Sequence, residues 1–164
     1  MAKANALPLV SLTQCLFHFS QQNEGSDFFY DRLETIIQEK VAQGVEYQLL
    51  VSIVQSYFKV KRGTPEFIEA LLNVLAKRID EGFEEDLVKV AQIIKAAKGE
   101  HSDLFRKIEN KITPGIERLE FAAICAVADG FGFENGTAEF WKKLEDSLRT
   151  KPLEQYSFEE LRLI

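Results

Sequence analysis

The residues that look most capable of chemistry lie in an acidic, glycine-rich stretch, where positions 129–136 read Asp-Gly-Phe-Gly-Phe-Glu-Asn-Gly. An EF-hand calcium loop needs oxygen ligands at alternate positions and a closing glutamate. This stretch has Phe131 and Phe133 at ligand positions and Phe140 at the closing one. A dinucleotide-binding turn needs a strand before it and a third glycine where Asn135 stands. The pattern therefore predicts a loop between two helices, without a bound metal or nucleotide.

Three aromatic side chains in and just after this loop form a first candidate binding site. They are Phe131, Phe133 and Trp141. We expect them to be exposed and to line a pocket for a partner protein. The alternative is that the stretch only connects two helices.

The cysteines and histidines do not combine into a catalytic or metal-binding pattern. Cys15 and Cys125 lie far apart in apolar surroundings without a CxxC pair, so neither a disulfide framework nor a zinc site is expected. His18 is expected on a helix surface, and His101 beside a helix start as a capping residue. We therefore expect no enzyme activity and no cofactor. A small-molecule enzyme is the third hypothesis, and it requires a deep polar pocket.

Basic side chains recur near the ends of two predicted helices and form a second candidate site. A stack of helices could align them along one edge that follows an RNA backbone. The competing explanation is that basic residues late in a helix and acidic residues early in it match the helix dipole. The residues of this candidate RNA- or anion-binding edge are Lys59, Lys61, Arg62, Lys95 and Lys98.

The composition is that of a folded, soluble protein. The chain has 164 residues, 46% of them hydrophobic and 28% charged, with a formal net charge of −6. The acidic balance is unlike that of a dedicated nucleic-acid binder. No apolar run approaches the roughly 20 residues of a membrane span. We expect no secretory signal, and the single basic residue before Arg32, Lys3, is unlike an Arg-rich mitochondrial transit peptide.

A repeated motif organises the chain. Residues 63–71 read Gly-Thr-Pro-Glu-Phe-Ile-Glu-Ala-Leu, and residues 136–144 read Gly-Thr-Ala-Glu-Phe-Trp-Lys-Lys-Leu. Related segments begin at Gly25 and Gly99. Taking the phenylalanine as the mark, the copies stand at Phe29, Phe67, Phe105 and Phe140, at steps of 38, 38 and 35 residues. A period in this range is typical of stacked helical hairpins.

Apolar spacing within each copy predicts two helices per repeat. Leu12, Cys15, Leu16 and Phe19 align with Leu50, Ile53, Val54 and Tyr57 at an offset of 38, so the chain begins on a second helix that acts as a cap. We predict an all-α fold, an α-solenoid of four to five hairpins with a period of about 37 residues. Its single domain, 1–164, comprises a cap helix at 9–24, repeat hairpins at 25–62, 63–98 and 99–135, and a C-terminal capping hairpin at 136–164.

The third repeat departs from the others. Pro114 and Gly115 should end its first helix early, and its second helix is expected at about 116–131. Alanines at 122, 123 and 126 replace larger residues of the other copies. This hairpin should therefore pack closer to its neighbour or leave space for a ligand.

The chain resembles heptatricopeptide and octotricopeptide repeats, akin to those that precede RAP domains in organellar proteins. The resemblance rests on the Gly-Thr-x-Glu-Phe-x-x-x-Leu pattern at 63–71 and 136–144 and on the Leu49-Leu50 and Leu87-Val88 pairs. The resemblance covers residues from about 9 to 149. It implies an organelle, usually the mitochondrion, and often RNA handling. The chain differs from such proteins in being acidic and in lacking a RAP-like end.

These features together favour a non-enzymatic scaffold or adaptor that binds other protein subunits. We expect it to be an accessory subunit of a large mitochondrial complex, with a cytoplasmic location as the alternative. An organellar RNA-binding protein is the alternative function. Neither a metal nor a membrane span is expected.

Overall fold

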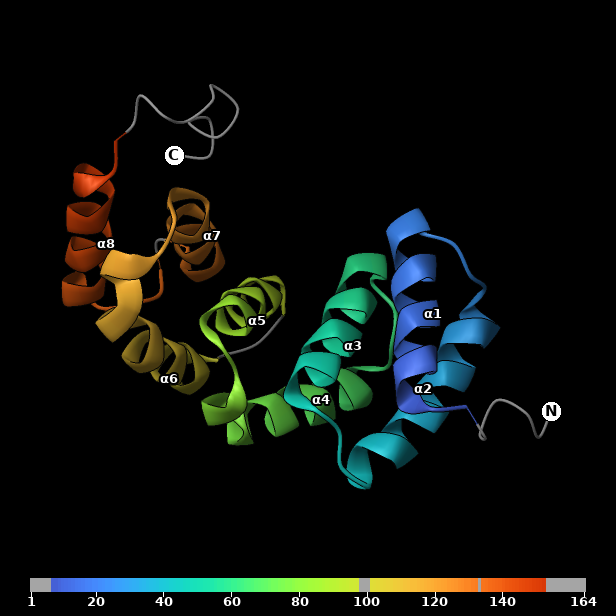
Figure 1. Cartoon of the computed structure of the whole chain (residues 1–164). Coiled ribbons are helices and arrows are strands. Elements are labelled where there is room, and N and C mark those ends of the chain that lie inside the picture. The colour runs from blue at the N-terminus through green and yellow to red at the C-terminus, as the bar shows by residue number, and fades with distance from the viewer. Residues whose placement is uncertain (1–6, 98–100, 133, 153–164) are drawn as a thin grey trace. The chain divides into compact units, whose positions relative to one another are not determined.

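The computed structural model describes residues 7–97, 101–132 and 134–152, and over these residues the chain is all-helical (Figure 1). The predicted all-α class is therefore confirmed. The described elements are α1 (Leu9–Gln22), α2 (Asp27–Ala42), α3 (Tyr47–Val60), α4 (Pro65–Lys77), the 3-10 helix η1 (Ile79–Glu81), α5 (Glu84–Ala96), α6 (Ser102–Ile112), the 3-10 helix η2 (Thr113–Arg118), α7 (Phe121–Phe131) and α8 (Ala138–Thr150).

The chain divides into two compact units, Met1–Gly82 and Phe83–Ile164. The division falls inside the hairpin predicted at 63–98, because α4 belongs to the first unit and α5 to the second. The sequence predicted one domain, and the repeat pattern did not reveal this boundary. Each unit is described by itself below.

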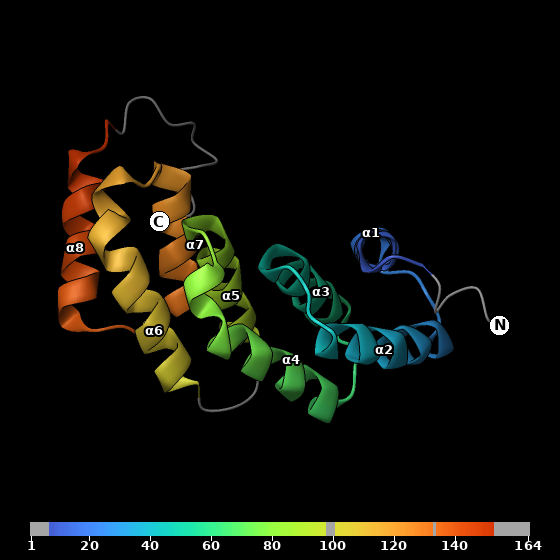
Figure 2. The same cartoon turned by 60° about the horizontal axis from the view of Figure 1, so that its bottom comes forward.

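In the first unit, α1 and α3 pack side by side, with α2 against α1 and α4 against α3 (Figure 2). The apolar faces of α1 and α3 meet in a core that includes Leu12, Leu16, Leu50 and Val54, all of which are buried. The sequence alignment had placed these four residues at equivalent positions. Their shared burial follows from a helical period that turns the same face inward in both helices.

The ends of α1 and α3 adopt the same backbone conformation, which supports the predicted offset of 38 residues. Asn23 and Lys61 are left-handed, with φ of 53° and 54°. The next amide in each case, Glu24 and Arg62, donates back to a carbonyl in the last helical turn, at 3.0 and 3.1 Å. This satisfies carbonyls that a helix end leaves open. The cap helix and α3 are thus structural copies of each other.

Three helices start with the same hydroxyl cap. The side-chain oxygens of Ser26, Thr64 and Thr137 accept hydrogen bonds from the amides three residues later, at 3.3, 3.3 and 3.2 Å. A carboxylate from an earlier helix holds each of the two threonines as well. Glu34 accepts from the amide and hydroxyl of Thr64, and Glu109 does the same for Thr137.

We expect Thr137→Ala to lower the free energy of unfolding by about 0.5–2 kcal/mol, because it removes the cap of α8 and the hydroxyl donor to Glu109. Thr137→Ser keeps the hydroxyl and is the matched control. Urea unfolding followed by the fluorescence of Trp141, the single tryptophan of the chain, measures both variants. Equal losses in the two variants would show that the hydroxyl does not stabilise α8.

In the second unit, α7 packs tightly against α5. A Cβ on Gly130 would lie 3.0 Å from the Ala91 Cβ and 3.0 Å from the Gln92 amide nitrogen. The small residues of α7 therefore allow it to approach α5 closely. Close packing was one of the two outcomes predicted for this hairpin, the other being space for a ligand. The predicted start of this helix at about 116 is wrong, because α7 begins at Phe121. The preceding residues form η2, in which Pro114 occupies the first turn and Ile116 is buried.

The phenylalanines that mark the repeat are not equally buried. Phe67, Phe105 and Phe140 are 1%, 6% and 0% exposed. Phe29 is only half-buried, and the neighbouring Tyr30 points into the core instead. The difference has a local cause, since the ring of Phe29 packs on Phe19 of α1, which is itself partly exposed.

Candidate functional site

The aromatic patch predicted at Phe131, Phe133 and Trp141 is wrong at Phe131. Phe131 is fully buried, with its ring centroid 4.4 Å from that of Phe140 and 5.3 Å from that of Phe105. Trp141 is half-buried, and Phe133 lies outside the described residues. Phe131 is thus a core residue and is not available to a partner.

A regular spacing explains the burial of Phe131. An aromatic residue near the end of one helix packs on the phenylalanine in the first turn of the next, in Phe19–Phe29 at 4.6 Å and Tyr57–Phe67 at 5.0 Å. The Phe131–Phe140 pair repeats this contact in the second unit. The ten- and nine-residue separations of these pairs are visible in the sequence, so this signal could have identified Phe131 as a core residue.

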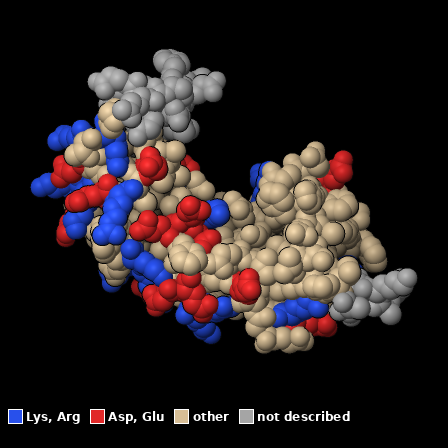
Figure 3. Space-filling view, viewed as in Figure 1, with Lys and Arg blue, Asp and Glu red and all other residues tan. Residues whose placement is uncertain are grey.

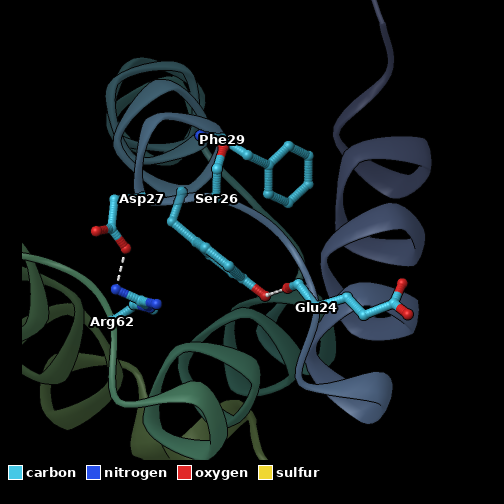
Figure 4. A network of polar contacts seen from close by, with 6 residues as sticks. Glu24, Ser26, Asp27, Phe29 and Arg62 are labelled. Carbon is cyan, nitrogen blue, oxygen red and sulfur yellow. Dashed lines mark hydrogen bonds and ion pairs between the residues drawn. The ribbon is translucent and has the colours of Figure 1, made fainter.

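Three aromatic side chains at or beside these contacts also donate hydrogen bonds through their polar groups. The Tyr30 hydroxyl donates to the Glu24 carbonyl at 2.7 Å (Figure 4), and the Trp141 indole N–H donates to the Asn135 carbonyl at 2.8 Å. Each acceptor precedes a glycine with positive φ. The Tyr57 hydroxyl donates to the Tyr30 carbonyl at 3.2 Å, and burial raises the pKa of the Tyr57 phenol. The phenol therefore stays neutral and keeps its donor at physiological pH.

The candidate basic edge is largely engaged by side chains of its own unit. Arg62 pairs with Asp27 (Figure 4), and Lys59 donates to the Gln21 amide oxygen. In the second unit the Lys95 ammonium lies 2.7 Å from the Asp129 carboxylate and 2.6 Å from the Asp129 carbonyl. Asp129, which lies in the last turn of α7 and not in the loop predicted at 129–136, thus serves as an ion-pair partner for Lys95.

The other two residues of the candidate basic edge, Lys61 and Lys98, do not extend it. Lys61 is exposed at the left-handed end of α3, and Lys98 lies outside the described residues. The basic residues of the first unit and Lys95 belong to separate compact units. A continuous phosphate-binding stripe therefore stays a prediction.

The titratable groups of the described residues do not form a metal centre. In ranges 7–97, 101–132 and 134–152, no three acidic, histidine or cysteine side chains gather as a metal site would require. Cys125 is buried, which raises the pKa of its thiol, whereas Cys15 is exposed. His18 is exposed as predicted, and His101 occupies the start of α6 without a capping hydrogen bond from its side chain.

A small cleft of about 180 Å³ lies beside the start of α8. Its polar wall includes Glu109, whose two carboxylate oxygens already accept hydrogen bonds from Thr137. The Glu109 carboxylate in this cleft is therefore already used to hold Thr137 at the start of α8. The full lining of the cleft is Glu109, Asn110, Thr113, Pro114, Thr137, Glu139 and Phe140.

The most unusual surface lies at the start of the chain, and the sequence reasoning missed it. Residues 7–23 contain no Asp, Glu, Lys or Arg. Four large apolar side chains of this stretch, together with Phe28 in the first turn of α2, are between 38% and 72% exposed. The surface over α1 and α3 is almost entirely free of charge (Figure 3). We call these five residues the neutral N-terminal face: Leu7, Val10, Phe17, Phe19 and Phe28.

Phe28 shows most clearly that this face is specialised. It stands in the first turn of α2, where the equivalent residues of α4 and α8 are Glu66 and Glu139. A carboxylate in a first turn is favoured by the helix dipole, and an exposed aromatic ring gains nothing there from burial. Phe28 is nevertheless 72% exposed. This departure from the repeat is the signal in the sequence that could have identified the site.

The neutral face includes a flank of α1 that is covered in its structural copy, α3. Ile53 and Tyr57 of α3 are fully buried, whereas their counterparts in α1, Cys15 and Phe19, are exposed. Val60 is buried and its counterpart Gln22 is exposed. An exposed apolar patch on a helix flank is typical of a protein contact surface.

Comparisons with known proteins assign no family to this fold and face: no protein-family model, curated protein or solved structure matches the chain. A membrane-spanning helix was also sought in the described part of the chain, and none of its helices has the length and apolarity required.

Proposed function

We propose that this protein is a non-enzymatic helical-repeat scaffold that binds another protein through its neutral N-terminal face. The observation that carries the proposal is the exposed Phe28, because its counterparts are the charged Glu66 of α4 and Glu139 of α8 and the buried Leu104 of α6. Within the described ranges, five of the six large exposed apolar residues belong to this face, the sixth being Phe83. Four of them lie in the charge-free stretch 7–23, and Phe28 follows in the first turn of α2. This concentration favours recognition of an apolar protein surface.

The recurrence of the same helix-end contacts supports a solenoid-like arrangement of the helices. Equivalent hydroxyl caps, left-handed helix ends and aromatic pairs recur along the chain. Such arrays expose terminal surfaces that need a cap or a partner. The first unit carries exposed apolar side chains on α1 and at the start of α2, which supports assembly with other subunits. Placement in a mitochondrial complex, as the repeat resemblance implies, is part of this proposal.

The RNA-binding alternative has weaker support. Arg62, Lys95 and Lys59 already contact Asp27, Asp129 and Gln21. Binding to a phosphate backbone would have to replace these contacts. The interaction test below therefore includes a nuclease-treated sample, in which an RNA-mediated association is lost.

We expect Phe28→Glu to reduce capture of the natural partner at least about tenfold, since a charge in an apolar contact is desolvated without a counter-ion. The substitution introduces the residue type found at the equivalent positions of α4 and α8, so the fold should persist. Phe83→Glu is the matched control, because Phe83 is also 72% exposed but belongs to the second unit.

The measurement is quantitative affinity capture of each tagged full-length variant from extract of the source cells. Loss of the same proteins from Phe28→Glu but not from Phe83→Glu supports the proposed face. Equal capture by wild type and Phe28→Glu contradicts it. Recovery of the tagged chain in purified mitochondria tests the proposed compartment separately.

A further inference from the structure

We propose that Asn135 is a modification site, at which the side-chain amide converts to a carboxylate when the turn between α7 and α8 opens. The inference concerns the second unit and does not depend on the neutral N-terminal face. It follows from the Asn135-Gly136 dipeptide, from the hydrogen bond that closes the end of α7 and from the contacts that hold this turn in place.

The turns after α1 and α3 are closed by main-chain hydrogen bonds. The Glu24 amide donates to the Phe19 carbonyl at 3.0 Å, and the Arg62 amide donates to the Tyr57 carbonyl at 3.1 Å. In each of these turns a glycine with positive φ follows the aromatic residue by six positions. Because the bonds use main-chain atoms alone, this closure does not depend on which residue stands before the glycine.

The turn after α7 is one residue shorter and uses a side chain instead. Gly136, with φ of 88°, follows Phe131 by five positions. The donor to the Phe131 carbonyl is here the Nδ2 atom of Asn135, at 2.8 Å. An ionised carboxylate at position 135 has no hydrogen to donate and would set one acceptor against another. The chemical identity of this side chain therefore matters to the closure of the turn.

An asparagine that precedes a glycine is prone to cyclise, because glycine has no side chain to shield its amide nitrogen. The Gly136 nitrogen loses its proton and bonds to Cγ of Asn135, while the Cγ–Nδ2 bond breaks and ammonia leaves with that proton. Water then opens the succinimide ring at either of its carbonyl groups. The products at position 135 are aspartate and isoaspartate, and the reaction needs no oxidant.

The folded turn restrains this reaction through two hydrogen bonds. The Phe131 carbonyl holds the Asn135 carboxamide, and the Trp141 indole N–H holds the Asn135 main-chain carbonyl at 2.8 Å. Gly136 lies against the Phe140 ring, since a Cβ placed on this glycine would be 2.8 Å from Cδ1 of Phe140. Attack requires the carboxamide to leave its partner and the main chain to turn. We therefore expect the reaction only when the turn opens locally.

The conversion is a one-way change in the second unit. Neither product can donate to the Phe131 carbonyl as Nδ2 does, and isoaspartate also lengthens the main chain by a methylene group where Trp141 binds it. The turn that precedes the Thr137 cap of α8 is then held less firmly. Each opening of the turn thus carries a chance of permanently weakening the start of α8.

Peptide mapping by mass spectrometry measures the conversion in the full-length chain during incubation at neutral pH. We expect Asn135 to convert in the folded chain, at a rate at least about tenfold below that in guanidinium chloride. Asn23 is the internal control, because it is followed by Glu24 and should convert far more slowly. Equal rates with and without denaturant would overturn control by the turn. A folded chain that converts no faster at Asn135 than at Asn23 would overturn the site.

Trp141→Phe tests whether the turn sets the rate. The substitution keeps an aromatic ring and removes the indole donor to the Asn135 carbonyl. Conversion in the folded chain should rise about 2- to 10-fold, the change that corresponds to loss of one hydrogen bond, and the rate in guanidinium chloride should not change. Far-ultraviolet circular dichroism verifies that the variant is folded. An unchanged rate in the folded variant would contradict control by this bond.

Asn135→Asp tests the consequence of the modification directly. It should lower the urea midpoint of the transition that Trp141 fluorescence reports, because the donor to the Phe131 carbonyl is lost. About 1 M salt screens the added charge but does not replace the donor, so the shift should persist there. A midpoint equal to that of the wild type, or a shift that salt abolishes, would overturn the role of the Asn135 donor.

Discussion

Phe67→Ala is expected to lower the free energy of unfolding by about 3–5 kcal/mol, the range for deletion of a buried aromatic ring. The Phe67 ring is 1% exposed and stands edge-on to Tyr57 at a centroid distance of 5.0 Å. It fills the joint between the end of α3 and the start of α4. Its removal leaves a cavity and deprives Tyr57 of one aromatic neighbour, while the contact with Tyr30 remains.

The control for this substitution is Phe28→Ala, which removes the same ring from a position that is 72% exposed. It should change stability by no more than about 0.5 kcal/mol. Phe29→Ala should fall between the two, because Phe29 is half-buried. Urea titration followed by far-ultraviolet circular dichroism measures the series. A response at Phe67 as small as that at Phe28 would refute the assignment of Phe67 to the joint.

Gly136→Ala is expected to destabilise the second unit by more than Gly44→Ala destabilises the first. Both glycines have positive φ, 88° at Gly136 and 104° at Gly44, where a side chain costs about 1–3 kcal/mol. A Cβ at Gly136 would also lie 2.8 Å from Cδ1 of the buried Phe140 ring, whereas one at Gly44 meets no atom within 4 Å. The added steric conflict should cost about 1–3 kcal/mol more.

The two glycine variants separate backbone strain from side-chain crowding. Trp141 fluorescence reports on Gly136→Ala, because the indole bonds the carbonyl of Asn135 next to that glycine. Circular dichroism reports on Gly44→Ala. The double variant Gly136→Ala with Phe140→Leu offers a further check, since the smaller side chain relieves the conflict and should make the two glycine penalties more similar. Equal losses for both single variants would mean that the approach to Phe140 is not restrictive.

Helix positions could be predicted from the sequence because their signals are local. Apolar spacing of three and four residues, Thr64 before Pro65, and the glycines at 25, 63 and 136 depend on neighbours a few residues away. The start of α7 was predicted five residues too early, at 116 in place of Phe121. Pro114 and Gly115 were recognised as the end of α6, but the 3-10 turn that follows depends on the burial of Ile116.

Burial of individual aromatics could not be predicted in the same way. Phe131 and Phe28 both follow or precede turns in the sequence, yet the first is fully buried and the second is 72% exposed. Which of them enters the core depends on the helix that reaches it, here α8 with Phe140. The basic residues pose the same problem, because their acidic partners Asp27 and Asp129 lie 34 or 35 positions away.

The sequence by itself determined the helical class, the repeat offset and the caps, because hydrogen bonds and apolar periods within one helix are short-range. Only the tertiary structure decided which side chains the packed helices cover. The loop predicted at 129–136 was partly wrong, because residues 129–131 form the last turn of α7, where Asp129 pairs with Lys95. The neutral face at Phe28 became the candidate site, because no neighbouring helix in the described chain covers it.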